Sequence, residues 1–218
     1  ASKSKAVSYG RIPQMEKRLQ QEIDELFALA QQADSEQADD FDIDNEIGRR
    51  RHKLSSLAQA KAILDQRASQ RHSEEQAEYE RKMAARQEKE KRIGKTSRGR
   101  TPQLPKPGTR DKDQYNFTDP ESRIMKNGNN KGFEQSYNAQ TAVEHGSRLI
   151  VGNTLSNHPN DKREGAPTAK AIPIELGKPE AAAMDNGYFG PETIQAFDAM
   201  GIDAYIAAGR DSHHLDLM

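Results

Sequence analysis

An aspartate at the end of an apolar run is the residue of this chain whose type and setting best suit chemistry. Asp185 follows Ala181–Met184 and precedes Asn186, Gly187 and Tyr188. We expect a buried strand to end here and a loop to lead into a helix, at the edge of an open α/β sheet where active sites form. A carboxylate at that edge offers the hard oxygen ligands that Mg²⁺ prefers. An aspartate in this position can equally cap the next helix or stabilise a turn, so the setting alone leaves both interpretations open.

The segment that must position Asp185 alternates between strand-like and helix-like patterns. Runs rich in Val, Ile, Tyr and Phe indicate strands, and a Gly146-Ser147 turn between two of them predicts a hairpin. Pro191 in a first helical turn and Gly201 at a helix stop bound a helix. The predicted order is strand 137–143, strand 148–155, a weak helix 161–176, the strand that ends at Asp185, helix 190–201 and strand 202–209. An antiparallel hairpin beside parallel strands predicts an α/β fold with a mixed sheet.

The N-terminal half has a helical pattern. Apolar residues recur at three- and four-residue steps in two stretches, and charged residues fill the other faces. The stripes are Met15, Leu19, Ile23, Leu26 and Ala30, then Leu54, Leu57, Ile63, Leu64 and Ala68. Because neither stripe is stable when exposed to water, we expect a coiled-coil-like antiparallel helical hairpin over residues 15–93. Residues 1–14 are then a lead-in strand or loop of a core formed by residues 114–218.

An acidic connection, residues 33–46, joins the two predicted helices. Asp40, Asp42 and Asp44 alternate as in a calcium-binding loop. The sixth position of such a loop is Asn45 instead of Gly, and the twelfth is Arg51 instead of Glu, so the sequence fails both requirements of that motif. We therefore interpret the connection as a solvated loop.

Residues 94–113 predict a flexible basic linker, because they combine Gly, Pro and basic residues without an apolar period. The candidate DNA-binding residues of this linker are Lys95, Arg98, Arg100, Lys106, Arg110 and Lys112. Such cations neutralise DNA phosphates without sequence preference. In the preceding helix the basic residues alternate with glutamates that weaken the field, so a solvated face is the better interpretation there.

Composition narrows the class of protein. Of the 218 residues, 33% are hydrophobic and 31% are charged, against about 45–50% and about 25% on average, so one compact core is not expected. The absence of Cys excludes disulfides and thiolate zinc sites. No apolar run approaches the roughly 20 residues of a membrane helix, and we expect a cytoplasmic protein without a membrane partner. The net charge of −1 neither requires nor excludes nucleic acid.

Several motifs, in one order, resemble the DDE transposases of bacterial insertion sequences. They are the opening ASKSKAVSYGR, TDPESRIM at 118–125, SYNAQ at 136–140, LIV at 149–151, Asp161, and DNGYF at 185–189. Ser136 stands where this family usually has Gly, and Glu144 stands where it commonly has Asp. The resemblance covers most of the chain and implies an internal fragment with a partial ribonuclease-H-like core, interrupted by the charged helical hairpin.

The resemblance also implies an activity. In this family two Mg²⁺ or Mn²⁺ ions, held by three acids, activate water and then a DNA 3′-hydroxyl for attack on a phosphodiester. The partners are double-stranded transposon ends and target DNA, and a homo-oligomer is left open. Asp185 matches the second acid, as catalytic and metal-binding residue. The first acid belongs on a strand before Ala1 and the final Glu on a helix beyond Met218, so we expect the metal pair only in the complete protein and no DNA cleavage by this chain alone.

Other interpretations remain open. A noncatalytic helical protein that binds partners or DNA would use the charged helices, and a phosphotransfer domain would use Asp185 for Mg²⁺, although such folds normally use parallel strands. Asp119 precedes Pro120 and is expected to be structural. Asp161 is expected to cap the next helix, with a supporting role near the metal as the alternative. His213 and His214 have no companion ligands at a recognisable spacing and are expected to be solvated.

Overall fold

The computed structural model describes residues 2–33, 42–97, 99–126 and 132–208. The chain divides into two units, Ser4–Pro120 and Glu121–Met218 with Ala1–Lys3, and each is described by itself. Long helices and short strands both occur, so the predicted α/β class is confirmed. Within the described ranges, no helix is both long enough and apolar enough to cross a membrane.

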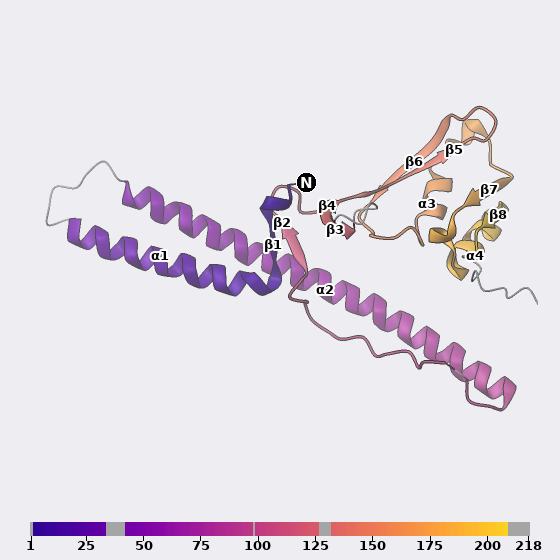
Figure 1. Cartoon of the computed structure of the whole chain (residues 1–218), viewed down its shortest axis with the longest axis horizontal. Helices are drawn as coiled ribbons and strands as arrows, with labels where there is room; N and C mark the ends of the chain where they lie inside the picture. Colours follow the sequence, from indigo (N-terminus) through magenta and orange to yellow (C-terminus); the bar gives the residue numbers. More distant parts are fainter. Residues whose placement is uncertain (1, 34–41, 98, 127–131, 209–218) are drawn as a thin grey trace, which may run out of the picture. The chain divides into compact units, whose positions relative to one another are not determined.

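Two long helices, α1 (Ile12–Ala33) and α2 (Ile43–Ile93), form the predicted helical hairpin of the first unit (Figure 1). Two buried clusters hold it together: Ile12 with Leu57 and Leu64, and Ile23 and Leu26 with Ile47. The start of α1 therefore packs on the middle of α2 and its end packs near the start of α2, which makes the pair antiparallel. Helix α1 begins three residues earlier than predicted, since Pro13 occupies a first-turn position where a missing N–H costs little.

The two ends of α2 carry ordinary helix-terminating signals. Asp42 accepts a hydrogen bond from the backbone N of Asn45 (3.0 Å) and so caps the helix. Gly94 ends it in the left-handed conformation, with φ of 69°, which glycine adopts without strain. The buried residues of α2 stop at Ala68, so the rest of the helix toward Ile93 has no buried residue. Most of the acidic connection, residues 34–41, lies outside the described residues.

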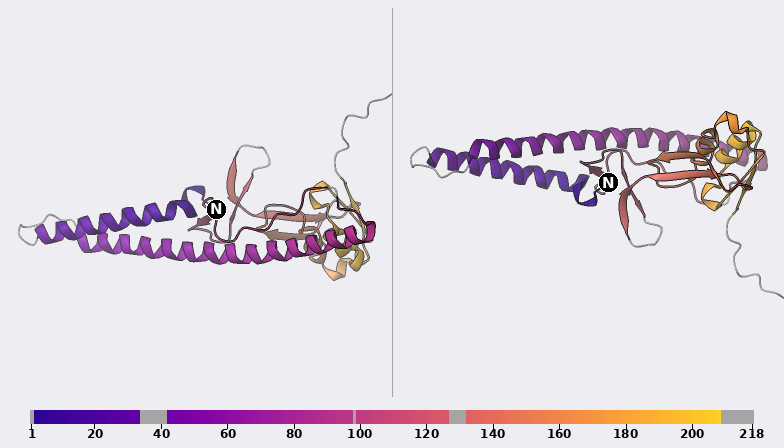
Figure 2. Two further views of the ribbon diagram at one scale, coloured as in Figure 1. Left: turned by 90° about the horizontal axis from the view of Figure 1, so that it is seen from below. Right: turned by 90° about the horizontal axis from the view of Figure 1, so that it is seen from above.

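The basic segment after α2 runs back beside that helix (Figures 1 and 2). Near its start, Nη2 of Arg86 donates to the carbonyl O of Ser97 (2.8 Å). Near its end, Nη2 of Arg71 pairs with Oδ2 of Asp113 (3.0 Å). The described residues of the segment, 94–97 and 99–113, have no regular secondary structure, as predicted. Arginines of α2 bind its carbonyl and carboxylate oxygens.

A short antiparallel ladder joins the two ends of the first unit. β1 (Ala6–Ser8) pairs with β2 (Gln114–Asn116). The side chain of buried Asn116 then accepts hydrogen bonds from the backbone N of Thr118 (3.0 Å) and of Asp119 (3.3 Å). Asp119 therefore lies in an Asx-type turn, where the sequence predicts a structural role.

The described residues of the second unit form three strand pairs. In sequence order they are β3 (Arg123–Lys126) with β4 (Phe133–Ser136), β5 (Asn138–Val143) with β6 (Ile150–Ser156), and β7 (Ala181–Met184) with β8 (Asp203–Ile206). The first two pairs are antiparallel and the third is parallel. The predicted hairpin is confirmed. The predicted single mixed sheet is not found among the described residues, because the antiparallel and parallel ladders are separate two-stranded pairs. The β3–β4 hairpin is an addition that the sequence pattern does not reveal.

The turn of the β5–β6 hairpin is organised by an acidic side chain. Glu144 accepts hydrogen bonds from the backbone N–H groups of Gly146 (2.7 Å) and Ser147. The Ser147 side chain, then these N–H groups, hold the pKa of Glu144 down to about 2. Arg148 adopts φ of 61° here, a conformation uncommon outside glycine.

Two short helices pack on strands of the second unit: α3 (Gly165–Lys170) on β5 and β6, and α4 (Pro191–Met200) on β8. The single turn η3 (Ile174–Leu176) follows α3 and is exposed. Helix α3 is shorter than predicted and ends before Pro173, which cannot donate an N–H to a helix. A Cβ on Gly152 of β6 would lie only 3.3 Å from the carbonyl O of Thr168, so glycine permits the close approach of α3.

Candidate active site

Strand β7 ends directly before Asp185, as the sequence predicts, but its residues are exposed or half-buried, so the predicted burial of this strand is wrong. β7 pairs in parallel with β8, and the single 3₁₀ turn η4 (Asn186–Tyr188) follows Asp185. Oδ1 of Asp185 accepts a hydrogen bond from the backbone N of Gly187 (2.7 Å). Asp185 is exposed, and no hydrogen bond from the described residues reaches its Oδ2. One oxygen therefore caps the turn while the other is available to a ligand, so both sequence interpretations apply to the same side chain.

The turn after Asp185 is attached to the strands on either side of it. Nδ2 of Asn186 donates to the carbonyl O of Ala207, one residue beyond β8 (3.0 Å). The hydroxyl of Tyr188 donates to Oε1 of Gln140, which lies in β5. These two side chains hold the turn between a parallel strand pair and an antiparallel one.

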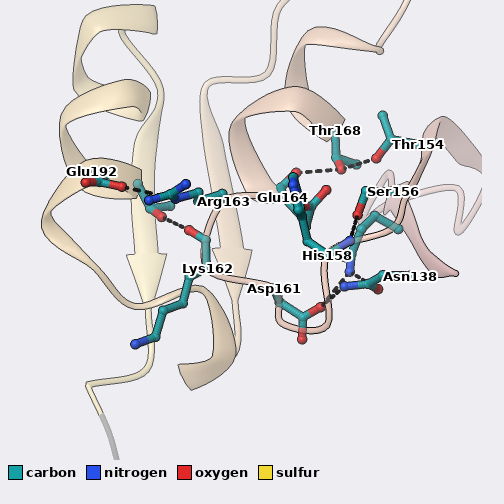
Figure 3. Close-up of polar contacts among 12 residues, drawn as sticks. Asn138, Thr154, Ser156, His158, Asp161, Lys162, Arg163, Glu164, Thr168 and Glu192 are labelled. Carbon is teal, nitrogen blue, oxygen red and sulfur yellow. Dashed lines mark hydrogen bonds and ion pairs between the residues drawn. The ribbon is translucent and has the colours of Figure 1, made fainter. Parts of the chain in front are cut away.

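A second aspartate joins this network. Oδ1 of Asp161 accepts hydrogen bonds from Nδ2 of Asn138 (2.8 Å) and Nε2 of Gln140 (2.7 Å), and Figure 3 shows the first of them. The predicted cap on the next helix is wrong, because α3 begins after Glu164 without a side-chain cap. At the start of α3, Asp161 contributes only its backbone carbonyl O, which accepts a hydrogen bond from the backbone N–H of Glu164 (2.9 Å).

Glycine at position 187 separates the two carboxylates. A Cβ built there would lie 2.9 Å from Oδ1 of Asp185 and 3.2 Å from Oδ2 of Asp161. The two oxygens are therefore no farther apart than the sum of these distances. Any larger residue would push one of the carboxylates away.

The surroundings of this turn are negatively charged. Burial raises the pKa of Tyr188, and the charges of Asp161, Asp185 and Glu164 raise it further, while the hydrogen bond to Gln140 opposes them. The buried carboxylate of Glu164 in turn contacts Nδ1 of exposed His158 (2.7 Å; Figure 3). A concentration of carboxylates attracts cations, which is the electrostatic condition for a metal site.

The carboxylate of Asp185 can serve as one metal ligand, but the described residues around it do not supply enough ligands for a pair of metal ions. The carboxylate oxygens of Asp185 are of the kind that Mg²⁺ binds. Within the part of the chain that the structure describes, no group of three His, Cys, Asp or Glu side chains is arranged to hold a metal ion. The described residues therefore do not by themselves form the two-metal site that the family resemblance implies.

A groove of about 670 Å³ lies beside Asp185. Consecutive residues of β5, from Gln140 to Val143, and all of β7, Ala181–Met184, line it. Because successive side chains of a strand point to opposite faces, consecutive lining residues mean that the strand edges border the groove. β5 pairs with β6 and β7 pairs with β8, so these two edges have no partner strand among the described residues. Residues of α3 and Phe197 of α4 also line the groove.

The predicted DNA-binding residues belong to the first unit. Lys95, Arg100, Lys106, Arg110 and Lys112 are exposed. Nη2 of Arg110 pairs with Oε1 of Glu75 (3.2 Å), which reduces its charge toward other partners. Arg98, like His213 and His214, lies outside the described residues.

Sequence reasoning from Asp185 alone misses its supporting residues. Asn138, Gln140 and Tyr188 carry no charge and belong to no spacing rule for a metal or a nucleophile. Their only signal is that they fall within the SYNAQ and DNGYF motifs on which the family resemblance rests.

The fold and the site together define an α/β protein that presents an acid at the end of a parallel strand, beside an antiparallel hairpin. Residues 94–216, more than half of the chain, match the sequence profile of the family described as the transposase DDE domain. The chain belongs to this family, and the predicted resemblance is confirmed. Comparisons with curated proteins and with solved structures give no match.

We predict that Gly187→Ala disturbs the Asp185 turn. The added methyl group would lie 2.9 Å from Oδ1 of Asp185 and should displace that oxygen from the amide of residue 187, which lowers the free energy of unfolding by about 1 kcal/mol, the net value of one hydrogen bond. Gly190→Ala is the matched control, because a Cβ there meets no atom within 4 Å. Urea denaturation of both variants measures the difference. Equal stabilities would contradict the crowding that we describe.

Proposed function

We propose that this chain forms the central part of a DNA transposase in which Asp185 is one of three metal-binding acids. The observation that carries the proposal is the exposed carboxylate at the end of β7, with Oδ1 bound to the turn and Oδ2 available. Membership of the transposase DDE domain family supports it. Transposition acts on chromosomal DNA, so the proposed location is the cytoplasm of a bacterial cell.

The proposed chemistry needs a divalent metal pair. When bound, two Mg²⁺ or Mn²⁺ ions supply an activated water, and then an activated DNA 3′-hydroxyl, for attack on a phosphodiester. The contribution of this chain is to hold one carboxylate rigidly. Asn186 and Tyr188 restrain the turn from two strands, so the oxygen of Asp185 is held in place before a metal arrives.

The groove between β5 and β7 is proposed to receive a strand that carries another of the acids. The family resemblance implies such a strand ahead of the position of Ala1. An extended segment between the two unpartnered edges would form backbone hydrogen bonds with both of them and would unite β6, β5, β7 and β8 in one sheet. Such a strand would run beside β7, and its end would lie near the Asp185 turn.

The basic segment 94–113 is proposed to bind DNA phosphates. The exposed cations of this segment are Lys95, Arg100, Lys106 and Lys112. Hydrogen bonds and ion pairs with α2 hold the segment in place, so binding these cations to DNA costs less conformational entropy than ordering a free linker. The proposed partners are double-stranded transposon ends and target DNA, and self-association of the chain stays a prediction.

We predict that the 218-residue chain alone does not nick supercoiled DNA in Mg²⁺ or Mn²⁺. Extension of the chain in its encoding frame, to include an upstream acid-bearing strand and a downstream Glu-bearing helix, should give metal-dependent nicking that Asp185→Asn abolishes. Asp203→Asn, which removes an exposed carboxylate from β8, is the control. Nicking by the extended protein that survives Asp185→Asn would refute a catalytic Asp185, and no nicking at all would favour a noncatalytic helical protein.

We also predict that a strand peptide fills the groove. A peptide with alternating apolar residues that ends in Asp-Gly-Thr should slow hydrogen exchange of amides in β5 and β7, because both edges gain hydrogen bonds. A scrambled peptide of the same composition is the control. Equal effects of the two peptides, or protection confined to β6 and β8, would contradict this use of the groove.

DNA binding by the basic segment should depend steeply on salt. Substitution of Arg100, Lys106 and Lys112 by Ala should reduce the slope of log affinity against log salt concentration by about one for each phosphate that is no longer neutralised. The control replaces three exposed cations elsewhere in the same unit, Arg11, Lys17 and Lys53. Fluorescence anisotropy with duplex DNA at several salt concentrations measures both variants, and a slope that changes equally in both would exclude a specific role for the segment.

A further inference from the structure

We propose that Asp161 is a positioning residue, which fixes the Asp185 turn by orienting Gln140 toward Tyr188. This inference rests on the proposed function of Asp185, since positioning matters only if that carboxylate is used. Asp161 comes from the loop between β6 and α3, Gln140 from β5 and Tyr188 from η4, so three separate parts of the unit meet in one network.

The first step is the orientation of Gln140. Its side-chain amide has a donor end and an acceptor end, and the residue is only 7% exposed, so both ends need partners inside the protein. An ionised carboxylate only accepts hydrogen bonds. Asp161 therefore binds Nε2 of Gln140 and leaves Oε1 directed at the hydroxyl of Tyr188. Nε2 of Gln140 also donates to Oδ1 of Asn138 (2.7 Å). Asp161 orients that second amide too, because it accepts a hydrogen bond from Nδ2 of Asn138. Without Asp161, both amides lose the acceptor that sets their orientation.

The second step runs from Tyr188 to Asp185. The backbone N of Tyr188 donates to the carbonyl O of Asp185 (3.2 Å), so tyrosine and aspartate belong to one turn. The ring of Tyr188 also reaches α3, where its Cδ1 lies 3.4 Å from the place of a Cβ on Gly165. Anchoring the tyrosine hydroxyl on β5 therefore fixes the turn that presents the carboxylate of Asp185.

The third step is the support behind Asp161 itself. Its carboxylate contacts β5 at two positions on the same face, Asn138 and Gln140. The loop around it is held from α4, because Oγ1 of Thr193 donates to the carbonyl O of Lys162 (2.7 Å). A carboxylate restrained on both sides is a rigid reference point for the turn. A helix cap would need none of these contacts.

The variants that test this inference each remove a single interaction. Tyr188→Phe removes only the hydroxyl and keeps the ring. Asp161→Ala removes the acceptor, whereas Asp161→Asn keeps an oxygen that can still bind Gln140. Tyr205→Phe is the control, because Tyr205 is 67% exposed on neighbouring β8. Far-UV circular dichroism checks that each variant is folded.

We expect nuclear magnetic resonance of the Gly187 and Tyr188 amides to separate the variants. Hydrogen exchange of the Gly187 amide should accelerate about fivefold in Tyr188→Phe and Asp161→Ala, the effect of removing one hydrogen bond. The Mn²⁺ dissociation constant, measured from broadening of these two signals, should rise about tenfold, as when a residue that supports a metal ligand is removed. Asp161→Asn should restore most of both values, and Tyr205→Phe should change neither.

Three results would overturn the positioning role. The first is a Gly187 amide exchange rate and a Mn²⁺ affinity in Tyr188→Phe that equal those of the wild type. If Asp161→Ala fails to fold, the result for Tyr188→Phe decides the question alone. The second is an equal loss in the Asn and Ala variants at Asp161, which would assign the effect to charge. The third is an equal change in Tyr205→Phe. None of these measurements requires DNA cleavage, so they are independent of the nicking assay that tests the proposed function.

Discussion

The hydrogen bond from the Gly187 amide to Oδ1 of Asp185 is the contact on which the candidate site depends. This hydrogen bond occupies Oδ1 of Asp185 and thereby fixes the direction in which Oδ2 points. A carboxylate in a flexible loop would have to be ordered by its ligand, at a cost in free energy. Here the turn is ordered by Asn186, which binds Ala207 just after β8, and by Tyr188, which binds Gln140 of β5. The glycine between them leaves room for both aspartates.

The two units of the chain follow different physical rules. The first is built from long helices with a narrow apolar stripe, and its polar segment 94–113 is fixed by arginines and carboxylates of α2. The second is built from short strands whose edges are only partly paired, and its polar residues converge on the Asp185 turn. One additional strand, as proposed above, would cover the open edges of β5 and β7 and would also add an acid to the described residues, which do not contain a three-residue metal cluster. A strand between them is the element that the proposed metal site requires.

Periodicity in the sequence predicts the helical hairpin, the β5–β6 hairpin and the strand that ends at Asp185, because each has a regular apolar pattern. It does not predict β3 and β4, since these strands are only four residues long and their sequences, RIMK and FEQS, do not alternate between apolar and polar residues. The candidate site divides in the same way. Asp185 is predictable from its place after an apolar run, whereas Gln140 and Tyr188 acquire their roles only through contacts between distant segments. For Asp161 the sequence predicts a helix cap, a common local use of Asp, and only the fold places it opposite Asn138 and Gln140.

The central claim is that the Asp185 turn binds a divalent metal ion, and mapping of paramagnetic broadening by Mn²⁺ tests it most directly. Added in small amounts to the ¹⁵N-labelled chain, Mn²⁺ broadens the amide signals nearest to its binding site. Our account predicts that the signals of residues 185–188 broaden first and that Asp185→Asn removes this effect, while Asp203→Asn does not. Broadening that begins elsewhere in the chain, or that persists at 185–188 in Asp185→Asn, would contradict it.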